Sequence, residues 1–430
     1  MKLLPIVLVA MVASPCQALE RSLTQSPQGH QIHNRQVFSP DGRFIYYDSR
    51  NDDTQLATST AIGRVEIVTG KEELLYRVAK PTTSGRGVGA VACHPITGRL
   101  VFIHGLANAS AAHPYAAYRR CGMSLTPDGN PVHLDARDVT PPFTPGALSG
   151  GTHAFHWSAD GTLISFTYND ALIPLRPAPD DLRTIGIMIP GRRVTVTDPT
   201  PDIEFSGDAF ATLVAPVTAT PKPGSDEISR AFDEGWLDAT RLAFQGTVQT
   251  VDGMPITELF LATLPGGPAA AQPQANSPPL PPLGITIRRL THTAGRKFPG
   301  IQGPRHWARP APDHSVIAFL AKDEQGIVQI FAVTADGGDL QQLSRLAQSV
   351  ESPFDWSPDS KFIACSAGGC IQLIEAATGT AKTLTATRPP GQEPRYAVTF
   401  SPDGHHIAFN RLLPHPNGGD FLQIQILDLR

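Results

Sequence analysis

The sequence predicts an all-β fold, and within that class a β-propeller with seven blades of four antiparallel strands. Two observations carry this prediction: a turn motif recurs along the chain between apolar strands, and its spacing corresponds to one blade. The composition agrees, because 38 glycines and 41 prolines among 430 residues require frequent turns.

The recurring turn is Ser-Pro-Asp-Gly or a variant of it. Proline presets φ at the second turn position, aspartate accepts hydrogen bonds from the local backbone, and glycine adopts positive φ. The weakest copy lies at residues 235–246, so six blades with one irregular insertion is the alternative. Seven copies are present: FSPDGRFIYYDSR (38–50), ACHPITGRLVFIHG (92–105), HWSADGTLISFTYND (156–170), GWLDATRLAFQG (235–246), ARPAPDHSVIAFLAKD (308–323), DWSPDSKFIACSA (355–367) and TFSPDGHHIAFNR (399–411).

The spacing of the last copies predicts both the blade size and the closure of the ring. The turn aspartates Asp313, Asp359 and Asp403 are 46 and 44 residues apart, and four strands in about 45 residues are typical of a propeller blade. After the last copy the chain has room for only one more strand. The segment Arg21–Thr24 has the Leu-Thr ending of the predicted outer strands, so we expect the N-terminus to complete the last blade and leave no open sheet edge.

Residues 1–18 have the pattern of a secretory signal peptide: Lys2, an apolar run and a small-residue cleavage site after Ala18. We therefore expect a periplasmic or secreted protein whose residues 19–430 form a single domain. No later segment is apolar for the length that a membrane span requires. The net charge of −4 gives no basic field for nucleic acid, and we expect a monomer.

Two segments depart from the repeat, and one pair of cysteines lies close together in the sequence. Residues 265–284 are rich in proline and predict an extended loop inside blade 4. Residues 225–234 (SDEISRAFDE) predict the start of a helix, with Ser225 as N-cap and acidic residues in its first turn. Cys365 and Cys370 flank a predicted hairpin turn, where they form either a disulfide across two strands or two small core residues; Cys93 and Cys121 are less obviously neighbours.

Residues just before each turn motif should converge, because the first strand of every blade lines the central channel of a propeller. The ends of the second strands should meet the same rim. The candidate ligand-binding residues are Asn34, Arg35, His104, Asp170, Arg305, Lys322, Arg395 and Tyr396.

Three histidines occupy similar positions in their repeats. His33, His153 and His306 are candidate ligands of a divalent metal such as manganese, because imidazole nitrogens bind such ions. Such a metal could polarise a uronate carboxylate held by Arg305 and Arg395. The alternative is that the histidines are hydrogen-bonded plugs at the channel mouth, or line a pocket for a protein partner.

Other catalytic patterns are absent from the sequence: it has no G-x-S-x-G elbow after the propeller, no P-loop and no G-x-G-x-x-G. The acidic pairs Asp52–Asp53 and Asp180–Asp181 are interpreted as solvated charges on loops.

The repeats resemble the TolB-type propellers of exported bacterial proteins. HQIHNRQVFSPDG, LDARDVTPPFTPGALSGGTHAF, PKPGSDEISRAFDEGW and IQGPRHWARPAPD resemble more closely the YidR-like propellers, a bacterial family that implies no particular activity. A more distant similarity connects the chain to oligogalacturonate lyases, propellers that hold manganese on histidines in the channel.

These observations support two hypotheses about function. The first is a non-catalytic module that binds a protein or a carbohydrate at its channel face, with an envelope protein or an acidic oligosaccharide as partner. The alternative is a metal-dependent lyase or hydrolase of acidic oligosaccharides, which the resemblance to oligogalacturonate lyases implies. A purely structural envelope-assembly protein is a third, weaker hypothesis.

Overall fold

The computed structural model describes residues 19–126, 129–171, 183–265, 281 and 284–429. The predicted signal peptide, the pair Asp180–Asp181 and nearly all of the proline-rich segment lie outside the described residues. Within them, no helix is long and apolar enough to cross a membrane.

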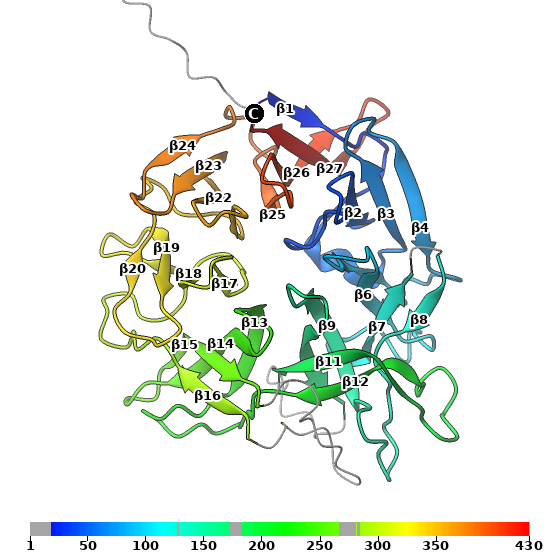
Figure 1. Cartoon of the computed structure of the whole chain (residues 1–430). Coiled ribbons are helices and arrows are strands. Elements are labelled where there is room, and N and C mark those ends of the chain that lie inside the picture. The colour runs from blue at the N-terminus through cyan, green and yellow to red at the C-terminus, as the bar shows by residue number, and fades with distance from the viewer. Residues whose placement is uncertain (1–18, 127–128, 172–182, 266–280, 282–283, 430) are drawn as a thin grey trace, which may run out of the picture.

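The chain forms a ring of seven antiparallel sheets, one for each copy of the turn motif (Figure 1). The prediction of seven blades rather than six is therefore confirmed. From the channel outward, blade 1 consists of β2 (Phe44–Asp48), β3 (Ala61–Glu66) and β4 (Glu72–Arg77), and blade 2 of β5 (Val88–Cys93), β6 (Leu100–Gly105), β7 (Arg120–Leu125) and β8 (Pro131–His133). Blade 3 consists of β9 (Gly150–Trp157), β10 (Ile164–Asp170), β11 (Arg183–Val194) and β12 (Gly207–Leu213). Blade 4 consists of β13 (Arg230–Trp236), β14 (Arg241–Gln249), β15 (Pro255–Thr263) and β16 (Thr286–Arg289).

The remaining three blades follow the same plan. From the channel outward they consist of β17 (Arg309–Pro310), β18 (Ile317–Lys322), β19 (Val328–Val333) and β20 (Gln341–Gln342); β21 (Asp355–Trp356), β22 (Phe362–Ala367), β23 (Cys370–Glu375) and β24 (Ala381–Thr383); and β25 (Arg395–Phe400), β26 (His406–Pro414), β27 (Asp420–Asp428) and β1 (Leu19–Ser22).

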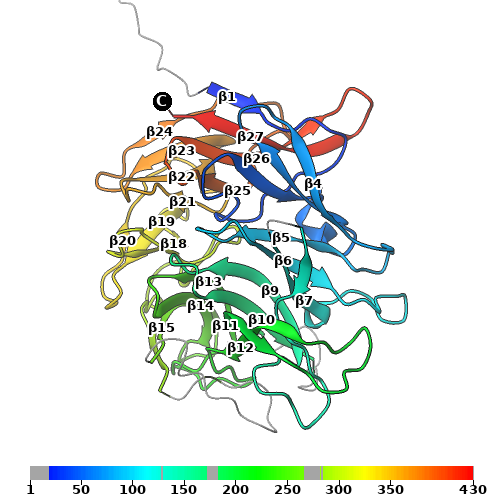
Figure 2. The same ribbon diagram turned by 45° about the vertical axis from the view of Figure 1, so that its right-hand side comes forward.

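The N-terminal strand closes the ring, as the sequence predicts. β1 pairs with β27 from Leu19 opposite Asp428 to Ser22 opposite Gln425, and the two strands lie side by side in both views (Figure 1, Figure 2). The strand begins two residues before the predicted segment. It is held by a buried ion pair, in which the fully buried Arg411 donates to Glu20 at 2.8 and 3.1 Å.

Blade 1 lacks a regular inner strand. Residues 31–38 take that position, but they pair with β2 only at two isolated bridges, Gln31 with Asp48 and Phe38 with Ile45. Between the bridges, residues 33–36, here called the crossing segment, bond to other blades. Asn34 accepts from Arg309, the carbonyl of Arg35 accepts from Thr399 Oγ1, and Gln36 exchanges two hydrogen bonds of 2.8 Å with the backbone of Trp157.

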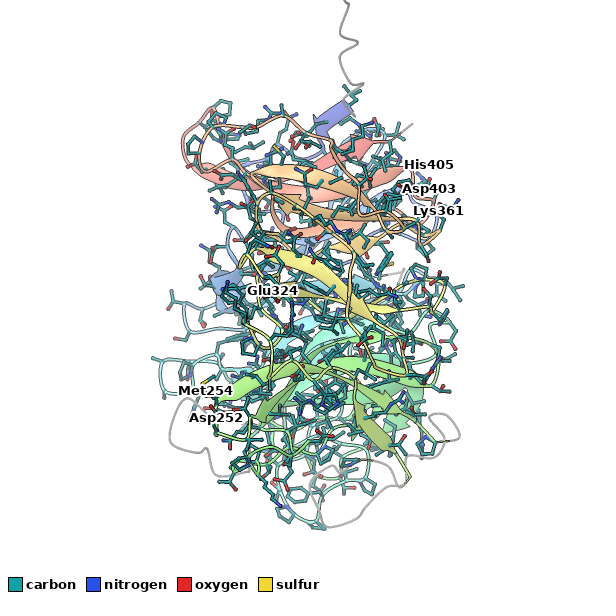
Figure 3. All side chains as sticks on the ribbon, turned by 90° about the vertical axis from the view of Figure 1, so that its left-hand side faces the viewer. Asp252, Met254, Glu324, Lys361, Asp403 and His405 are labelled. Atoms are coloured by element: carbon teal, nitrogen blue, oxygen red, sulfur yellow. The ribbon has the colours of Figure 1, made fainter. Side chains whose placement is uncertain are left out.

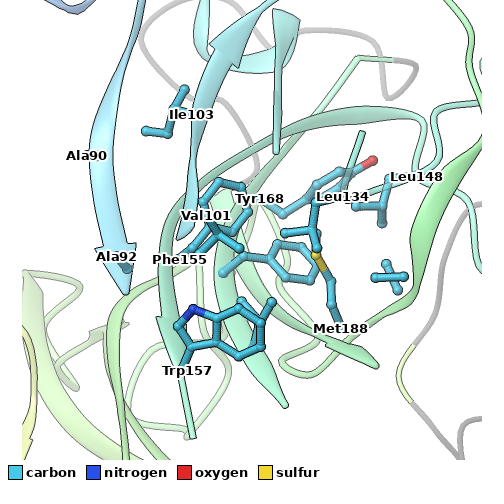
Figure 4. Close-up of a cluster of buried hydrophobic side chains, with 14 of the residues drawn as sticks. Ala90, Ala92, Val101, Ile103, Leu134, Leu148, Phe155, Trp157, Tyr168 and Met188 are labelled. Carbon is cyan, nitrogen blue, oxygen red and sulfur yellow. The ribbon is translucent and has the colours of Figure 1, made fainter. Parts of the chain in front are cut away.

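Apolar side chains fill the spaces between neighbouring blades. Figure 4 shows the layer between blades 2 and 3, where Val101 of β6 meets Phe155 and Trp157 of β9 together with Tyr168 and Met188. Further clusters connect blade 3 to blade 4 and blade 5 to blade 6. Because both faces of each sheet are covered, the strands are apolar on both sides, and polar residues concentrate at the channel and at the two ends of the ring.

The hairpin turns lie at two opposite ends of the molecule (Figure 3). Turns between second and third strands, marked by Asp252, Met254 and Glu324, lie on one side. The Ser-Pro-Asp-Gly-type turns, marked by Lys361 and Asp403, lie on the other. Inner strands begin on the side of the former, so that side carries the channel mouth.

The predicted helix at residues 225–234 is wrong. Ser225 lies in a turn, where its Oγ donates to the carbonyl of Lys222, and residues from Arg230 onward form β13, the inner strand of blade 4. Ile228 and Ala231 are buried in the layer between blades 3 and 4. Burial of these residues and the β13–β14 ladder outweigh a favourable capping sequence, as tertiary packing commonly does.

Of the two alternatives for Cys365 and Cys370, a disulfide or two small core residues, the structure shows the second. Cys365 pairs in register with Gln372, and Cys370 with Ala367, so the two cysteines are not opposite each other. The four cysteines at 93, 121, 365 and 370 are buried free thiols.

We expect ring closure to depend on the buried pair of Arg411 and Glu20. Replacing Arg411 with Met removes the nearer partner and leaves Glu20 only its 3.4 Å contact with the partly exposed Arg388, so the cost should be at most the about 3–5 kcal/mol of a fully broken buried pair. Thermal unfolding should show a clear drop in Tm. The matched control is Arg43→Met, whose partner Glu66 lies at 2.9 Å but whose side chain is 61% exposed, so its Tm should barely change. Equal effects of the two substitutions would contradict this account of closure.

Candidate binding site at the channel mouth

Irregular inner strands position the side chains at the channel. Ala90, Ala154, Asp233 and Tyr396 have φ between 50° and 58°, and each lies in an inner strand where the register with the second strand shifts. A β-bulge of this kind re-aims the residues that follow it. In β9 the bulge at Ala154 leaves His153 opposite Thr167 and His156 opposite Ser165. Thr167 donates to Glu234 of blade 4, so both histidines lie on the face of β9 toward that blade.

Three adjoining cavities form the channel mouth, with volumes of about 330, 460 and 360 Å³. Arg305 lines all three, and His33 and Asp53 line two of them. Their walls come from starts of inner strands and from the loop after β2, which includes the short 3-10 helix η1 (Asp53–Ala57).

Positive side chains predominate at this mouth, although the whole chain has a net charge of −4. Three carboxylates line the cavities, from Asp53, Asp233 and Glu351. Twice as many guanidinium groups do so, and none of the lining residues is a lysine. The arginines are Arg50, Arg120, Arg183, Arg230, Arg305 and Arg395.

Arg305 is held in place at the junction of the three cavities. It donates to the carboxylate of Asp233 at 2.7 and 3.0 Å, and its guanidinium lies 4.9 Å from the ring centroid of Trp307. Its side chain is nevertheless 49% exposed. A guanidinium fixed by an acid on one side and an indole ring on the other is pre-oriented to bind a second anion.

The other mouth arginines differ in how far their charge is compensated. Arg50 is buried and donates to both oxygens of Asp48, at 2.7 and 2.8 Å, and to Asp53 at 3.2 Å. No carboxylate of the described residues forms an ion pair with three of the others, which are Arg120, Arg230 and Arg395. These three supply the excess positive charge.

The three predicted metal-binding histidines are all found in the channel walls. Burial, followed by the charges of Arg50 and Arg305, lowers the pKa of His33 well below its usual value. Burial has the same effect on the pKa of His153, and it lowers that of His306 to about 4. The rings are therefore neutral at neutral pH, the form that binds metals.

The bonding of these rings does not fit a three-histidine metal site. Within the described part of the chain, His33 Nε2 and His153 Nδ1 have no hydrogen-bond partner. His306, however, uses both nitrogens: Nδ1 bonds to the carbonyl of Pro304 at 2.9 Å, and Nε2 accepts from the amide of Leu320 at 2.9 Å. Across the described part of the chain, no group of three or more His, Cys, Asp or Glu side chains is placed to hold a metal ion.

A polar pair lies deeper in the channel. Glu234 of β13 is fully buried, and its Oε1 lies 3.8 Å from Nδ1 of His156. Burial, together with the neighbouring charge of Asp233, raises the pKa of Glu234 to about 8, while burial lowers that of His156 well below its usual value. Both side chains are therefore uncharged at neutral pH. Neither nitrogen of His156 has a hydrogen-bond partner.

The structure brings some of the other predicted residues to the mouth and leaves others outside it. Arg395 and Tyr396 line the mouth, and the hydroxyl of Tyr396 donates to Asp52 at 3.2 Å. Asn34 and Arg35 belong to the crossing segment. His104, Asp170 and Lys322 do not line the mouth cavities.

Those three residues have partners elsewhere because second strands lie one strand farther from the axis. His104 uses both ring nitrogens, bonding to Tyr76 Oη at 3.1 Å and to the carbonyl of Gly105 at 2.5 Å. Asp170 accepts from Ser149 and from Tyr168. Lys322 lies 5.5 Å from the ring centroid of Phe298.

Sequence reasoning overlooked much of the site. Asp53, interpreted as a solvated loop charge, lines two cavities. Asp233 and Glu234 were assigned to a helix that is in fact an inner strand. Trp307 and Arg309 lie just before or within a recognised turn copy, at the phase of inner-strand residues, and that phase was the signal available for finding them.

Comparison with known proteins identifies the family. The "Uncharacterized protein YidR" of Escherichia coli (strain K12) is 36% identical over 401 residues, which cover 90% of this chain and 94% of that protein. The chain belongs to the YidR-like family. A family model described as "Protein of unknown function (DUF3748)" matches residues 87–202, which span blade 2 and most of blade 3. The YidR-like assignment made from the sequence is therefore confirmed.

Solved structures show what the YidR-like fold is similar to. An oligogalacturonate lyase in complex with manganese has a TM-score of 0.53 at 10% identity, with coverage of 96% of this chain and 97% of that one. An oligogalacturonate lyase from Vibrio parahaemolyticus has a TM-score of 0.55 at 10% identity, covering 98% and 96%. A putative TolB from Agrobacterium tumefaciens has a TM-score of 0.42 at 14% identity, covering 86% and 98%. The lyase similarities establish the fold alone.

We expect Glu234 to make the stability of this YidR-like propeller dependent on pH. Its pKa of about 8 in the folded protein exceeds that of an unfolded glutamate. The contribution of protonated Glu234 to the free energy of unfolding is therefore fully present below the unfolded pKa near 4.5. It is lost as the pH rises toward 8, by about 1.4 kcal/mol for each unit of difference between the folded and unfolded pKa. Glu234→Gln should remove this slope and make the variant the more stable protein at pH 8.

Urea unfolding at pH 5, 6.5 and 8 measures this slope. The matched control is Glu258→Gln, because Glu258 is equally buried but accepts hydrogen bonds from Thr291, Thr293 and Arg289. That substitution should destabilise the protein at all three pH values. A Glu234→Gln variant with the wild-type slope would show that the carboxyl is ionised in the folded protein.

Proposed function

We propose that this protein is an exported propeller that binds an acidic oligosaccharide at its channel mouth. The observation that carries the proposal is the excess of arginines over carboxylates in the three cavities that meet at Arg305. Guanidinium groups bind carboxylates through two parallel hydrogen bonds. A row of them suits a ligand that carries one carboxylate on each of several sugar units.

The arrangement of the cavities supports an extended ligand rather than a single small anion. Arg305 lies between the cavity that contains Arg395, the cavity that contains Arg230 and the cavity that contains Arg120. A chain of uronate units across this junction would meet a separate guanidinium at each cavity. Trp307, Pro353 and Pro394 also line the cavity that contains Arg395, so part of its wall is apolar.

The second candidate function is cleavage of such an oligosaccharide. It is supported by the fold shared with oligogalacturonate lyases, one of which is in complex with manganese. His33 and His153 present ring nitrogens without partners, but His306 does not, so we derive no step through a metal. Ultraviolet absorbance of unsaturated uronate products, measured with and without added Mn²⁺, separates a lyase from a binding protein.

The proposed location is the periplasm or the outside of the cell. It rests on the signal-peptide pattern of residues 1–18, which includes a small-residue cleavage site after Ala18. Fractionation of cells that express the full chain, with mass spectrometry of the mature N-terminus, tests it. An uncleaved protein in the cytosolic fraction would contradict it.

We expect Arg305 to be the principal anchor of an acidic ligand. Arg305→Met should weaken the binding of trigalacturonate by about tenfold to hundredfold, since a charge-assisted hydrogen bond is lost. Arg305→Lys should retain only part of the affinity because it cannot bind bidentately. Calorimetric titration measures both, and affinity should fall as NaCl rises.

Two comparisons control this experiment. Arg241→Met removes an arginine that pairs with Asp238 at 2.7 Å at the opposite end of the ring, so affinity should stay at the wild-type value. A neutral trisaccharide of similar length should bind the wild-type protein weakly. If the neutral trisaccharide binds as tightly as trigalacturonate, the arginines are not the basis of recognition.

A further inference from the structure

Arg309 is a buried cation without a matching anion. It lies in β17, is 3% exposed, and lines none of the mouth cavities. Its hydrogen bonds go to the carbonyl of Phe354 at 3.0 Å and to the side-chain oxygen of Asn34, and both acceptors are neutral. No carboxylate within the described ranges forms an ion pair with it.

The charged groups around Arg309 do not neutralise it. Asp355 of β21 attracts it, but that carboxylate already accepts from Thr399 Oγ1 at 2.9 Å. Asp233 of β13 is engaged by Arg305. Arg35 of the crossing segment repels it, and burial together with this repulsion lowers the pKa of Arg309 to about 10.

Polar side-chain groups without hydrogen-bond partners among the described residues lie beside Arg309. Among the described residues, Asn34 Nδ2 and Trp307 Nε1 are donors without an acceptor, and the neutral ring of His156 leaves its one N–H and its one acceptor nitrogen without partners. Each of these three side chains is more than nine-tenths buried. The indole N–H and the amide NH₂ can only donate. His156 packs edge-on against Trp307 with ring centroids 5.6 Å apart, and the guanidinium of Arg309 lies 5.7 Å from the same indole ring. These groups therefore belong to one cluster.

Buried cations and unpaired donors each carry a large desolvation cost, which a bound acceptor with negative charge removes. We propose that the channel interior holds a small oxyanion, of the carboxylate or phosphate class, bound by the guanidinium of Arg309 with N–H groups of Asn34 and Trp307. This inner site goes beyond the proposed oligosaccharide site, because Arg309 and Asn34 line none of the three mouth cavities and the site requires no sugar.

The anion has two possible sources with the same chemistry. It is either a carboxylate of a uronate that reaches past Trp307, or a free ion such as inorganic phosphate. Trp307 lines a mouth cavity on one side and contacts His156 on the other, so it lies between the two sites.

Thermal unfolding of the mature full-length protein tests the proposal. In a buffer without oxyanions, added phosphate or galacturonate should raise the Tm of the wild-type protein by several degrees and in a saturable way, as expected for a ligand that binds only the folded state. Chloride at equal ionic strength should not do so. If neither oxyanion shifts the Tm beyond the chloride control, the inner site does not exist.

The variant Arg309→Met tests whether the anion-dependent rise in Tm arises from the cluster around Arg309. The variant should lose the anion-dependent shift, with binding at least about tenfold weaker, and it should fold without an anion because it no longer buries an unpaired charge. Trp307→Phe removes only one N–H and keeps an aromatic ring, so it should reduce the shift and serves as the test if Arg309→Met does not fold. A full wild-type shift in both variants would overturn the assignment.

Arg305→Met separates the inner site from the mouth. It should weaken trigalacturonate binding by about tenfold to hundredfold and retain the phosphate shift, whereas Arg309→Met should lose the phosphate shift. If Arg309→Met also weakens trigalacturonate, the inner anion is a carboxylate of the oligosaccharide; if it does not, the inner site takes a free anion. If the wild-type protein fails to bind trigalacturonate but shows the phosphate shift, the mouth site alone is rejected.

Discussion

The crossing segment meets the main physical constraint on this fold, which is the exposed inner edge of each blade. An inner strand is paired on one side only, and its other backbone groups face the channel, where unpaired groups are costly. Gln36 bonds to both the amide and the carbonyl of Trp157, as a neighbouring strand would, and its own carbonyl accepts from the amide of Cys93. Blade 1 therefore forgoes a regular inner strand and uses those residues to connect the other blades.

The position of this segment explains why the channel has two polar levels. Above it, the starts of the inner strands and the loop after β2 leave a mouth with half-exposed arginines. At its own level, Asn34 and Arg35 meet Arg309 and the buried pair of Glu234 and His156. The first level is accessible, since the side chain of Arg305 there is 49% exposed, so it suits a large acidic ligand. At the second level the side chain of Arg309 is buried, so its unpaired positive charge carries a large desolvation cost.

The fold was predictable because its information is local and repeated. A Ser-Pro-Asp-Gly-type turn determines a hairpin within a few residues, and seven such hairpins, the last three of them 46 and 44 residues apart, specify a ring. The prediction of a helix at 225–234 was wrong for the converse reason. That segment has a good capping sequence but no turn motif, and only the neighbouring sheets make Arg230–Trp236 a strand. The error concealed Glu234, one of the most strongly perturbed groups in the channel.

The site was predictable only where its residues keep the phase of the repeat. His33, His153, Arg305, Arg395 and Tyr396 were placed at the channel by counting back from the turns, and the structure finds them in the mouth walls. Counting fails where a bulge adds a residue, as between His153 and His156, since one extra residue changes the face of every side chain that follows.

The sequence by itself thus predicted a propeller with seven blades favoured over six, the closure by the N-terminal strand and the arrival of the inner-strand starts at the channel, because these depend on turn chemistry and on the repeat. Only the tertiary structure decided which of the converging side chains are free to bind. His306 is occupied by Pro304 and Leu320, whereas Arg309 is left without an anion. Pairing and desolvation depend on residues from several blades, and distance along the chain carries no information about them.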